Sequence, residues 1–327
     1  MNDTSDKKKS ELGGLVVESD VKEDKNNFTQ EIEDTLKITE QAVIDQLKNP
    51  AESASWATAR SVVAKFQPVP WFIWRISNFV LGTPGQVHQV NEGFVLGLRR
   101  LIFATASDPY LGSGEKVNDV KKALKIVAHD VIAAAAVIHA ICRRLATKEF
   151  ERIWRPILED AVLRCQIGSL IGTQDESFGQ GRGMLAGFSS RAGLAVLLSS
   201  GTLEQARDAL ELLATGKEIS EVGLQVFKCN PLQVSAMMLS ATGCGRDAAF
   251  GTVSYAYKDS SNKVENQEQL KWLAAFSVTE SIRVGKADQI EPKYWEILKL
   301  DNSEVQAEIL DQSKKIIRRG HEWGWIL

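Results

Sequence analysis

The chain has 327 residues, of which 44% are apolar and 25% charged, an ordinary composition for a globular protein. Its 39 basic and 42 acidic residues give a net charge of -3, which excludes a molecule-wide basic surface for nucleic acid but not a local basic patch. The longest apolar run, 131–138, is far shorter than the roughly 20 residues that a membrane helix requires. We therefore expect neither a membrane nor a nucleic-acid partner.

The first 35 residues are polar and carry charges of both signs, with a short apolar patch within 12–17. Such a segment buries too little apolar surface to offset the entropy lost on ordering, so the sequence predicts a disordered tail over 1–35. No hydrophobic segment follows the charged start, which is unlike a secretory signal.

The four cysteines are widely separated, and no two of them form a CxxC pair that could hold structural zinc. Each has apolar or small neighbours, so we predict buried, reduced thiols and a cytoplasmic location.

Helical periodicity dominates the rest of the chain, which we divide into an N-terminal helical segment (36–104), a helical core (105–258) and closing helices with a C-terminal tail (259–327). Apolar residues at steps of three and four predict one long helix over about 118–146. Alternating strand patterns are scarce, and the best of them, 252–257, fits a helical turn equally well. The expected fold class is therefore all-α.

Local signals mark the starts of several later helices. Thr202 with Gln205 three residues on is a capping-box pattern. Asn230 before Pro231 places a capping side chain ahead of a proline at the first helical position, and Pro292 gives a similar start. These signals predict short helices joined by tight connections.

Only four histidines are present, which limits metal and nucleophilic chemistry. His129 and Asp130 form a literal HD pair, the signature of metal-dependent phosphohydrolases, but such enzymes gather several His and Asp side chains around one or two ions. His139, ten residues along the same predicted helix, would lie roughly 15 Å away and could not share the ion. These observations disfavour a metal site, and a phosphohydrolase using His88, His129 and Asp130 is the alternative function.

Other candidate motifs have simpler interpretations. Residues 179–183 (Gly-Gln-Gly-Arg-Gly) lack the preceding strand and the lysine of phosphate-binding loops, so we predict a flexible connection between helices. Cys142 lies three residues after His139, so the two side chains could touch along one helix. We attribute this spacing to packing and not to cysteine catalysis. Basic residues gather between Arg143 and Arg164 and again in 314–319, and we predict solvated helix ends there, with an anionic partner as the other interpretation.

The order of several short motifs resembles the HDOD family, degenerate relatives of the HD phosphohydrolases. Residues 186–198 (Ala-Gly-Phe-Ser-Ser-Arg-Ala-Gly-Leu-Ala-Val-Leu-Leu) resemble the family's AGLLHDIGxLxLL-type segment. Upstream, Trp154 is similar to the tryptophan that opens the preceding helix, and downstream 219–223 and 234–239 resemble a glutamate-bearing and a small-residue helix. The resemblance covers about 105–320 and implies an HD/HDOD-like orthogonal bundle of many helices.

The resemblance also implies a loss of chemistry, because Ser190 and Arg191 stand where phosphohydrolase relatives have the His-Asp dyad. An arginine has no lone pair with which to ligate a metal. Members of the family are regarded as bacterial regulatory modules that keep the helical scaffold without the metal site. The resemblance therefore implies a pseudoenzyme, a non-catalytic regulatory or scaffold module in bacterial signal transduction, with no catalytic residue, metal or cofactor.

Such a module would act by binding a protein partner or a small anionic effector. We predict effector contacts at Arg191, Ser190 and Arg182, with the Arg191 guanidinium contacting phosphate or carboxylate in a fork geometry. The simpler interpretation is that Arg191 pairs with a nearby acid of its own chain. A homo-oligomer, and a helical interaction protein unrelated to HDOD, stay open as hypotheses.

Overall fold

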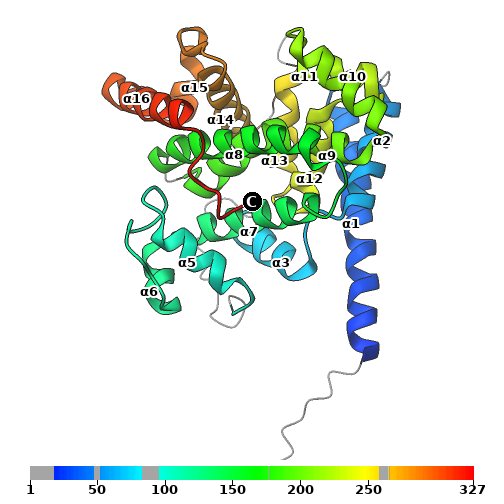
Figure 1. Cartoon of the computed structure of the whole chain (residues 1–327), viewed down its shortest axis with the longest axis horizontal. Helices are drawn as coiled ribbons and strands as arrows, with labels where there is room; N and C mark the ends of the chain where they lie inside the picture. Colours follow the sequence, from blue (N-terminus) through cyan, green and yellow to red (C-terminus); the bar gives the residue numbers. More distant parts are fainter. Residues whose placement is uncertain (1–17, 48–51, 83–95, 176, 258–263, 265) are drawn as a thin grey trace, which may run out of the picture.

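The computed structural model describes residues 18–47, 52–82, 96–175, 177–257, 264 and 266–327. These residues form helices joined by turns and contain no β-strand, so the all-α prediction is confirmed (Figure 1). The elements in chain order are α1 (Glu18–Leu47), α2 (Ser53–Phe66), α3 (Trp71–Val80), η2 (Leu96–Leu98), α5 (Arg99–Ser107), α6 (Val120–Ile126), α7 (His129–Leu145), α8 (Glu151–Gln174), α9 (Gln180–Ser200), α10 (Leu203–Ala214), α11 (Ile219–Phe227), α12 (Pro231–Ala241), α13 (Arg246–Ser254), η3 (Tyr255–Tyr257), α14 (Gln267–Arg283), η4 (Ala287–Gln289), α15 (Pro292–Ile297) and α16 (Ser303–Arg319).

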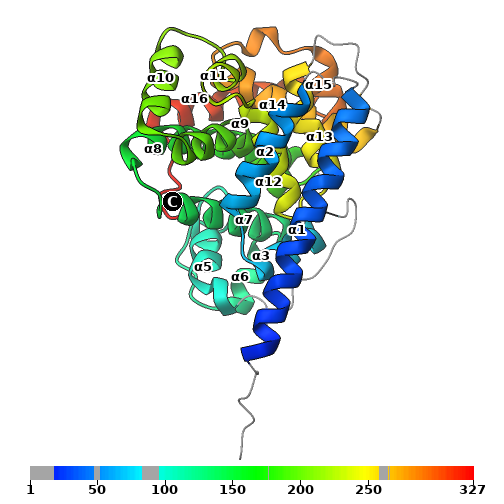
Figure 2. The ribbon, with the colours of Figure 1, turned by 90° about the vertical axis from the view of Figure 1, so that its right-hand side faces the viewer.

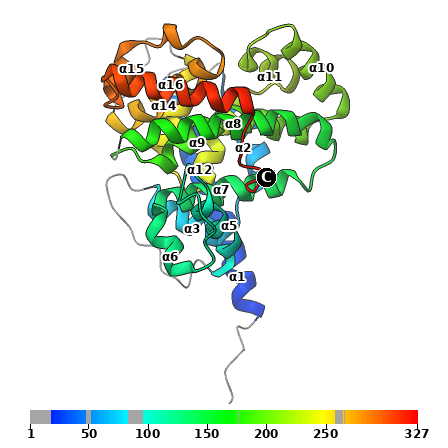
Figure 3. The same ribbon diagram turned by 60° about the vertical axis from the view of Figure 1, so that its left-hand side comes forward.

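Helix α9 is the centre of the molecule and is buried on nearly all sides. It packs along α8 and is flanked by α7, α12 and α14 (Figures 1 and 3). A Cβ atom at Gly168 of α8 would collide with the carbonyl oxygen of Gly183, and one at Gly187 would collide with that of Arg164. The two helix backbones can therefore approach closely only because these positions are glycine.

The glycine-rich stretch 179–183 is not a flexible connection, which corrects the sequence interpretation. Gly179 is the N-cap of α9, and Gln180–Gly183 form its first turn. The helix passes so close to α7 that a Cβ at Gly181 would collide with the carbonyl oxygen of Asp130. These glycines serve helix packing and not loop flexibility.

The long helix predicted over 118–146 is two helices, α6 and α7, bent by 107° at their junction. Val127 and Ala128 adopt extended backbone conformations there, and Asp119 caps α6 by accepting from the backbone nitrogen of Lys122 at 2.7 Å. The apolar pattern continues through the break because Val127 is also buried, so periodicity alone could not reveal it.

Helix α1 begins inside the segment predicted to be a disordered tail, so that prediction is wrong for residues 18–35. Ile32, Leu36 and Val43 are buried, and α1 packs on α2 and α12 (Figure 2). The hydroxyl of Thr39 lies 2.6 Å from that of Ser240 on α12. The segment's own composition does not offset the entropy lost on ordering, but its contacts with helices distant in the chain do. Residues 1–17 lie outside the described part of the chain.

The predicted helix starts are confirmed. Thr202 and Gln205 form both hydrogen bonds of the capping box. Asn230 accepts from the backbone nitrogen of Leu232 at 2.9 Å, ahead of Pro231 at the first position of α12. Residues 252–257, the best strand candidate, are the end of α13 followed by η3.

The C-terminal segment closes the fold by lying across α7 (Figure 1). Trp323 and Ile326 are fully buried, and the carbonyl oxygen of Ile326 lies 3.0 Å from Nδ1 of His139. The four cysteines are free and buried, as predicted. Among the described helices none is by itself long and apolar enough to cross a membrane; α6 with α7 has the length and composition, but the pair is sharply bent.

Candidate functional site

Arg191 lies within a cluster of charged side chains contributed by α8, α9 and α14. Its Nη2 donates to Oε1 of Glu280 at 2.9 Å, and its Nε lies 3.5 Å from Oδ2 of Asp160. Arg164 donates to Oδ2 of Asp160 at 2.8 Å and also to Oε2 of Glu280. Arg283 donates to Oδ1 of Asp160 at 2.7 Å. We call these five residues the arginine–carboxylate cluster; every one of its four carboxylate oxygens accepts from an arginine.

Burial and the neighbouring charges shift the pKa values of two members of this cluster. The side chain of Arg164 is 3% exposed, and burial together with the charge of Arg191 lowers its pKa. Burial alone would raise the pKa of Asp160, but the attraction of Arg164, Arg283 and Arg191 outweighs it and holds that pKa below its usual value. Asp160 is therefore ionised at neutral pH. The prediction that Arg164 belongs to a solvated basic cluster is wrong.

Arg191 and Glu280 also line a pocket of about 270 Å³. Tyr255 and Phe276 form one side of it, with ring centroids 4.8 Å apart. Burial and the charges of Glu280 and Glu218 raise the pKa of Tyr255 to about 12, so its phenol is neutral at physiological pH. Glu218 lines the pocket as well, so two carboxylates and one guanidinium face it.

The three predicted effector contacts do not come together. Ser190 is buried, and its hydroxyl donates to the carbonyl oxygen of Gly187 at 2.7 Å. Arg182 lies nine residues before Arg191 on α9, roughly 13 Å away along the axis. It is also buried and donates to the carbonyl oxygen of Leu81 at 3.0 Å. Of the three, only Arg191 lines the pocket, and effector binding by any of them stays a prediction.

The aspartate of the HD pair, at the start of α7, accepts a hydrogen bond from the start of α9. Oδ2 of Asp130 accepts from the backbone nitrogen of Gly181 at 2.7 Å, which places this carboxylate at the N-terminus of α9. His129 beside it is half-buried. In the described parts of the chain, no three His, Cys, Asp or Glu side chains are grouped as a metal site requires, and His88 lies outside those parts.

A second buried charge links the α8–α9 connection to α14. Lys271 is 5% exposed, and its Nζ donates to Oγ of Ser177 at 2.6 Å. The Ser177 hydroxyl in turn donates to Oδ1 of Asp175 at 2.6 Å. Nζ of Lys271 also lies 3.9 Å from Oδ2 of Asp175. These contacts tie Asp175 and Ser177 to α14.

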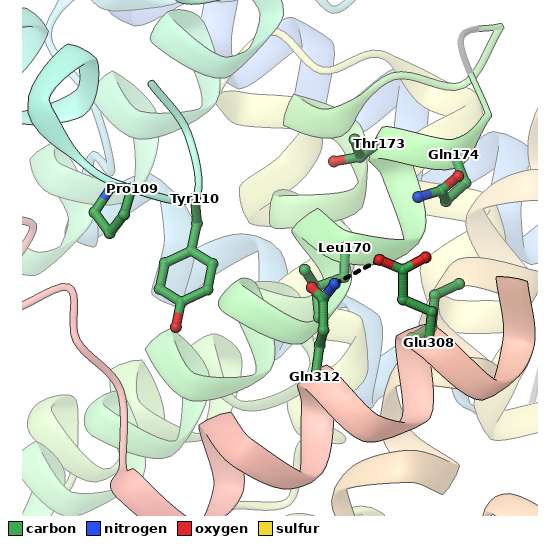
Figure 4. Close-up of a pocket in the computed structure, with 8 residues that line it drawn as sticks. Pro109, Tyr110, Leu170, Thr173, Gln174, Glu308 and Gln312 are labelled. Carbon is green, nitrogen blue, oxygen red and sulfur yellow. Dashed lines mark hydrogen bonds between the residues drawn. The ribbon is translucent and has the colours of Figure 1, made fainter. Parts of the chain in front are cut away.

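A pocket of about 230 Å³ lies between the α5–α6 connection, α8 and α16 (Figure 4). Tyr110 and Gln312 line it from opposite elements, and Gln312 donates to Oε1 of Glu308 at 2.9 Å. None of the candidate site residues predicted from the sequence lies in it.

Sequence reasoning missed three members of the arginine–carboxylate cluster: Asp160, Glu280 and Arg283. The four-residue spacing from Asp160 to Arg164 is an available signal for an ion pair on one helix face. Nothing local could have joined Glu280 to Arg191, because 89 residues separate them in the chain.

Two solved structures have a similar fold. A protein from Shewanella amazonensis SB2B, described as a "putative phosphohydrolase", aligns with a TM-score of 0.54 and 12% identity over 80% of this chain and 94% of its own. A "putative signal transduction protein" from Marinobacter aquaeolei VT8 aligns with a TM-score of 0.56 and 14% identity over 85% of this chain and 64% of its own. No family model and no curated protein matches the chain. At these identities the likeness establishes the fold alone.

Proposed function

We propose that this chain is a non-catalytic regulatory or scaffold module of the HDOD type in bacterial signal transduction, and that it acts by binding a protein partner. The observation that carries the proposal is the arginine–carboxylate cluster, in which each oxygen of Asp160 and Glu280 accepts from an arginine. Arg191, at the position that resembles the lost dyad, is one of the donors. The two structural neighbours, described as a "putative phosphohydrolase" and a "putative signal transduction protein", are compatible with this origin.

Metal-dependent phosphoester hydrolysis needs carboxylate and imidazole lone pairs that are free to ligate an ion. Here three guanidinium groups contact all four carboxylate oxygens of the cluster, and their positive charge repels a divalent cation. The arrangement therefore supports a structural role for these groups in holding α8, α9 and α14 together.

A protein partner is better supported than a small anionic effector. The charge of Arg191 is shared with Glu280, and Glu218 lines the same pocket. An anion entering the pocket would meet two carboxylates, whose repulsion offsets the attraction of the single arginine.

The proposal is tested by incubating the full chain with p-nitrophenyl phosphate and bis(p-nitrophenyl) phosphate in the presence of Mg²⁺, Mn²⁺ or Fe²⁺. We expect no turnover above the protein-free reaction. Turnover that scales with protein concentration and is lost in His129→Ala would establish the alternative phosphohydrolase. Turnover that survives in His129→Ala but is lost in Asp160→Asn would place catalysis at the cluster, and either result overturns the proposal.

A further inference from the structure

A groove of about 770 Å³ lies between α1, the α2–α3 connection, α3 and the C-terminal half of α7. These helices lie side by side in Figures 1 and 2. Val69 and Ile73 are buried members of its lining, and the aromatic side chains of Phe28, Trp71 and Phe72 line it as well. Trp71 keeps 39% of its surface exposed, which is unusual for the largest apolar side chain in a folded chain. The groove is thus an open recess with an aromatic lining.

Two arginines from the last turn of α7 form one rim of this groove. Arg144 donates from Nε to the carbonyl oxygen of Phe66 at 2.9 Å and from Nη2 to Oε1 of Gln67 at 3.3 Å, both neutral acceptors. The ion pairs found among the described residues involve neither Arg143 nor Arg144. Their charges are therefore available to a partner.

A third cation adds to the positive potential at the aromatic side of the groove. The guanidinium of Arg75 lies 5.6 Å from the ring centroid of Trp71. Glu33, from α1, is the carboxylate that lines the groove. The charged side chains that line the recess are thus two arginines and one glutamate, and Arg75 lies next to the lining on Trp71, which gives a net positive balance.

We infer that this groove binds an acidic, apolar segment of a protein partner. Apolar side chains of the segment would cover Trp71 and Phe72, and its carboxylates would pair with Arg143 and Arg144. Tryptophan and arginine are, with tyrosine, the residues that most often carry the binding energy of protein interfaces, and both types line this recess. The inference rests on the proposed function, since it specifies the surface and the chemistry of the partner.

A lipid surface fits this groove less well than a peptide does. Glu33 contributes negative charge to the recess that holds Arg143, so a uniformly anionic surface would be repelled at one of its sides. A peptide can place carboxylates beside the arginines and neutral or basic side chains beside Glu33.

The inference is tested by selecting random peptides displayed on phage against the immobilised full chain, followed by calorimetric titration of the most enriched synthetic peptide. We expect enriched sequences that combine Asp or Glu with Leu, Phe or Trp. The affinity should fall roughly tenfold or more in Arg143→Glu and in Trp71→Ala, since both lie on the proposed surface. Arg207→Glu is the matched control, because Arg207 is an exposed arginine on the distant helix α10 and should leave the affinity unchanged. Urea denaturation establishes that each variant is folded.

Two outcomes of the peptide experiments would overturn the inference: enriched peptides without an excess of acidic residues, or equal affinity for Arg143→Glu and the wild type. A third is co-sedimentation of the chain with phosphatidylserine vesicles when no peptide is enriched. None of these outcomes bears on the phosphoester assay. Turnover in that assay would instead refute the non-catalytic function whatever the groove binds, so the two failures are distinguishable.

Discussion

Arg164 shows how the central charges both depend on and stabilise the fold. Burial disfavours its charged form, and Asp160 and Glu280 compensate by accepting its hydrogen bonds. Replacing a whole buried network by apolar groups can leave the stability unchanged. Removing one partner is destabilising, because it leaves an unpaired charge in a low-dielectric interior. The individual residues of the cluster are therefore coupled, and each should be sensitive to substitution.

Glu280→Gln should lower the free energy of unfolding by about 3–5 kcal/mol, because Arg164 and Arg191 would lose the charge that compensates their burial. Urea denaturation followed by far-UV circular dichroism measures this loss. Arg155→Ala is the control: Arg155 pairs with Glu151 and Glu159 on the exposed face of α8, and its removal should cost about 1 kcal/mol or less. Equal losses in the two variants would contradict a structural role for the cluster.

Asp160 should contribute a pH-dependent part of the stability. Its pKa is lower in the folded chain than in the unfolded chain, so its contribution is present above the unfolded pKa of about 3.9 and is lost as the pH falls through the folded value. The stability difference between wild type and Asp160→Asn should therefore shrink between about pH 5 and pH 2. Urea denaturation across this range measures it, and a difference that stays constant or grows on acidification would contradict the assignment.

At the scale of elements, the sequence predicts what is local and misses what is long-range. The capping box at Thr202 and the Asn230–Pro231 start are confirmed because the groups that form them are close in the chain. The bend between α6 and α7 was missed because buried residues continue through it. The sequence predicts a loop for the glycines of 179–183, because nothing near them in the chain reveals that α7 and α8 lie against them.

Gly168→Ala should destabilise the chain by about 1–3 kcal/mol or more, because the added methyl group would collide with the backbone of Gly183 and force α8 and α9 apart. Gly324→Ala provides the comparison, since a Cβ there meets nothing within 4 Å and should change the stability by about 0.5 kcal/mol or less. Thermal and urea unfolding of both variants decide the point. A neutral Gly168→Ala would mean that the central helices are less tightly packed than described.

At the scale of the whole molecule, the chain keeps a fold shared with two proteins to which it is 12% and 14% identical. The all-α class followed from the helical periodicity of the sequence and is confirmed. The joining of α8, α9 and α14 by one set of ion pairs could not be predicted, because those pairs connect residues that the sequence separates by up to 123 positions. The candidate site is thus a property of the assembled fold.

The C-terminal segment should be integral to this assembly. Trp323→Ala should cost about 3–5 kcal/mol, because the indole is fully buried and its removal leaves a large cavity. Trp71→Ala removes the same side chain from a position that is 39% exposed and should cost much less. Differential scanning calorimetry compares the two, and a Trp323→Ala variant as stable as Trp71→Ala would show that the segment does not help to hold the fold together.

The central claim is that the carboxylates between α8, α9 and α14 hold arginines and not a metal ion. The most direct test is the melting temperature of the full chain titrated with Mn²⁺ up to about 1 mM, because an ion that binds only the folded state must raise its stability. We predict a melting temperature that is unchanged across the titration. A saturable rise that disappears in Asp160→Asn would contradict the account.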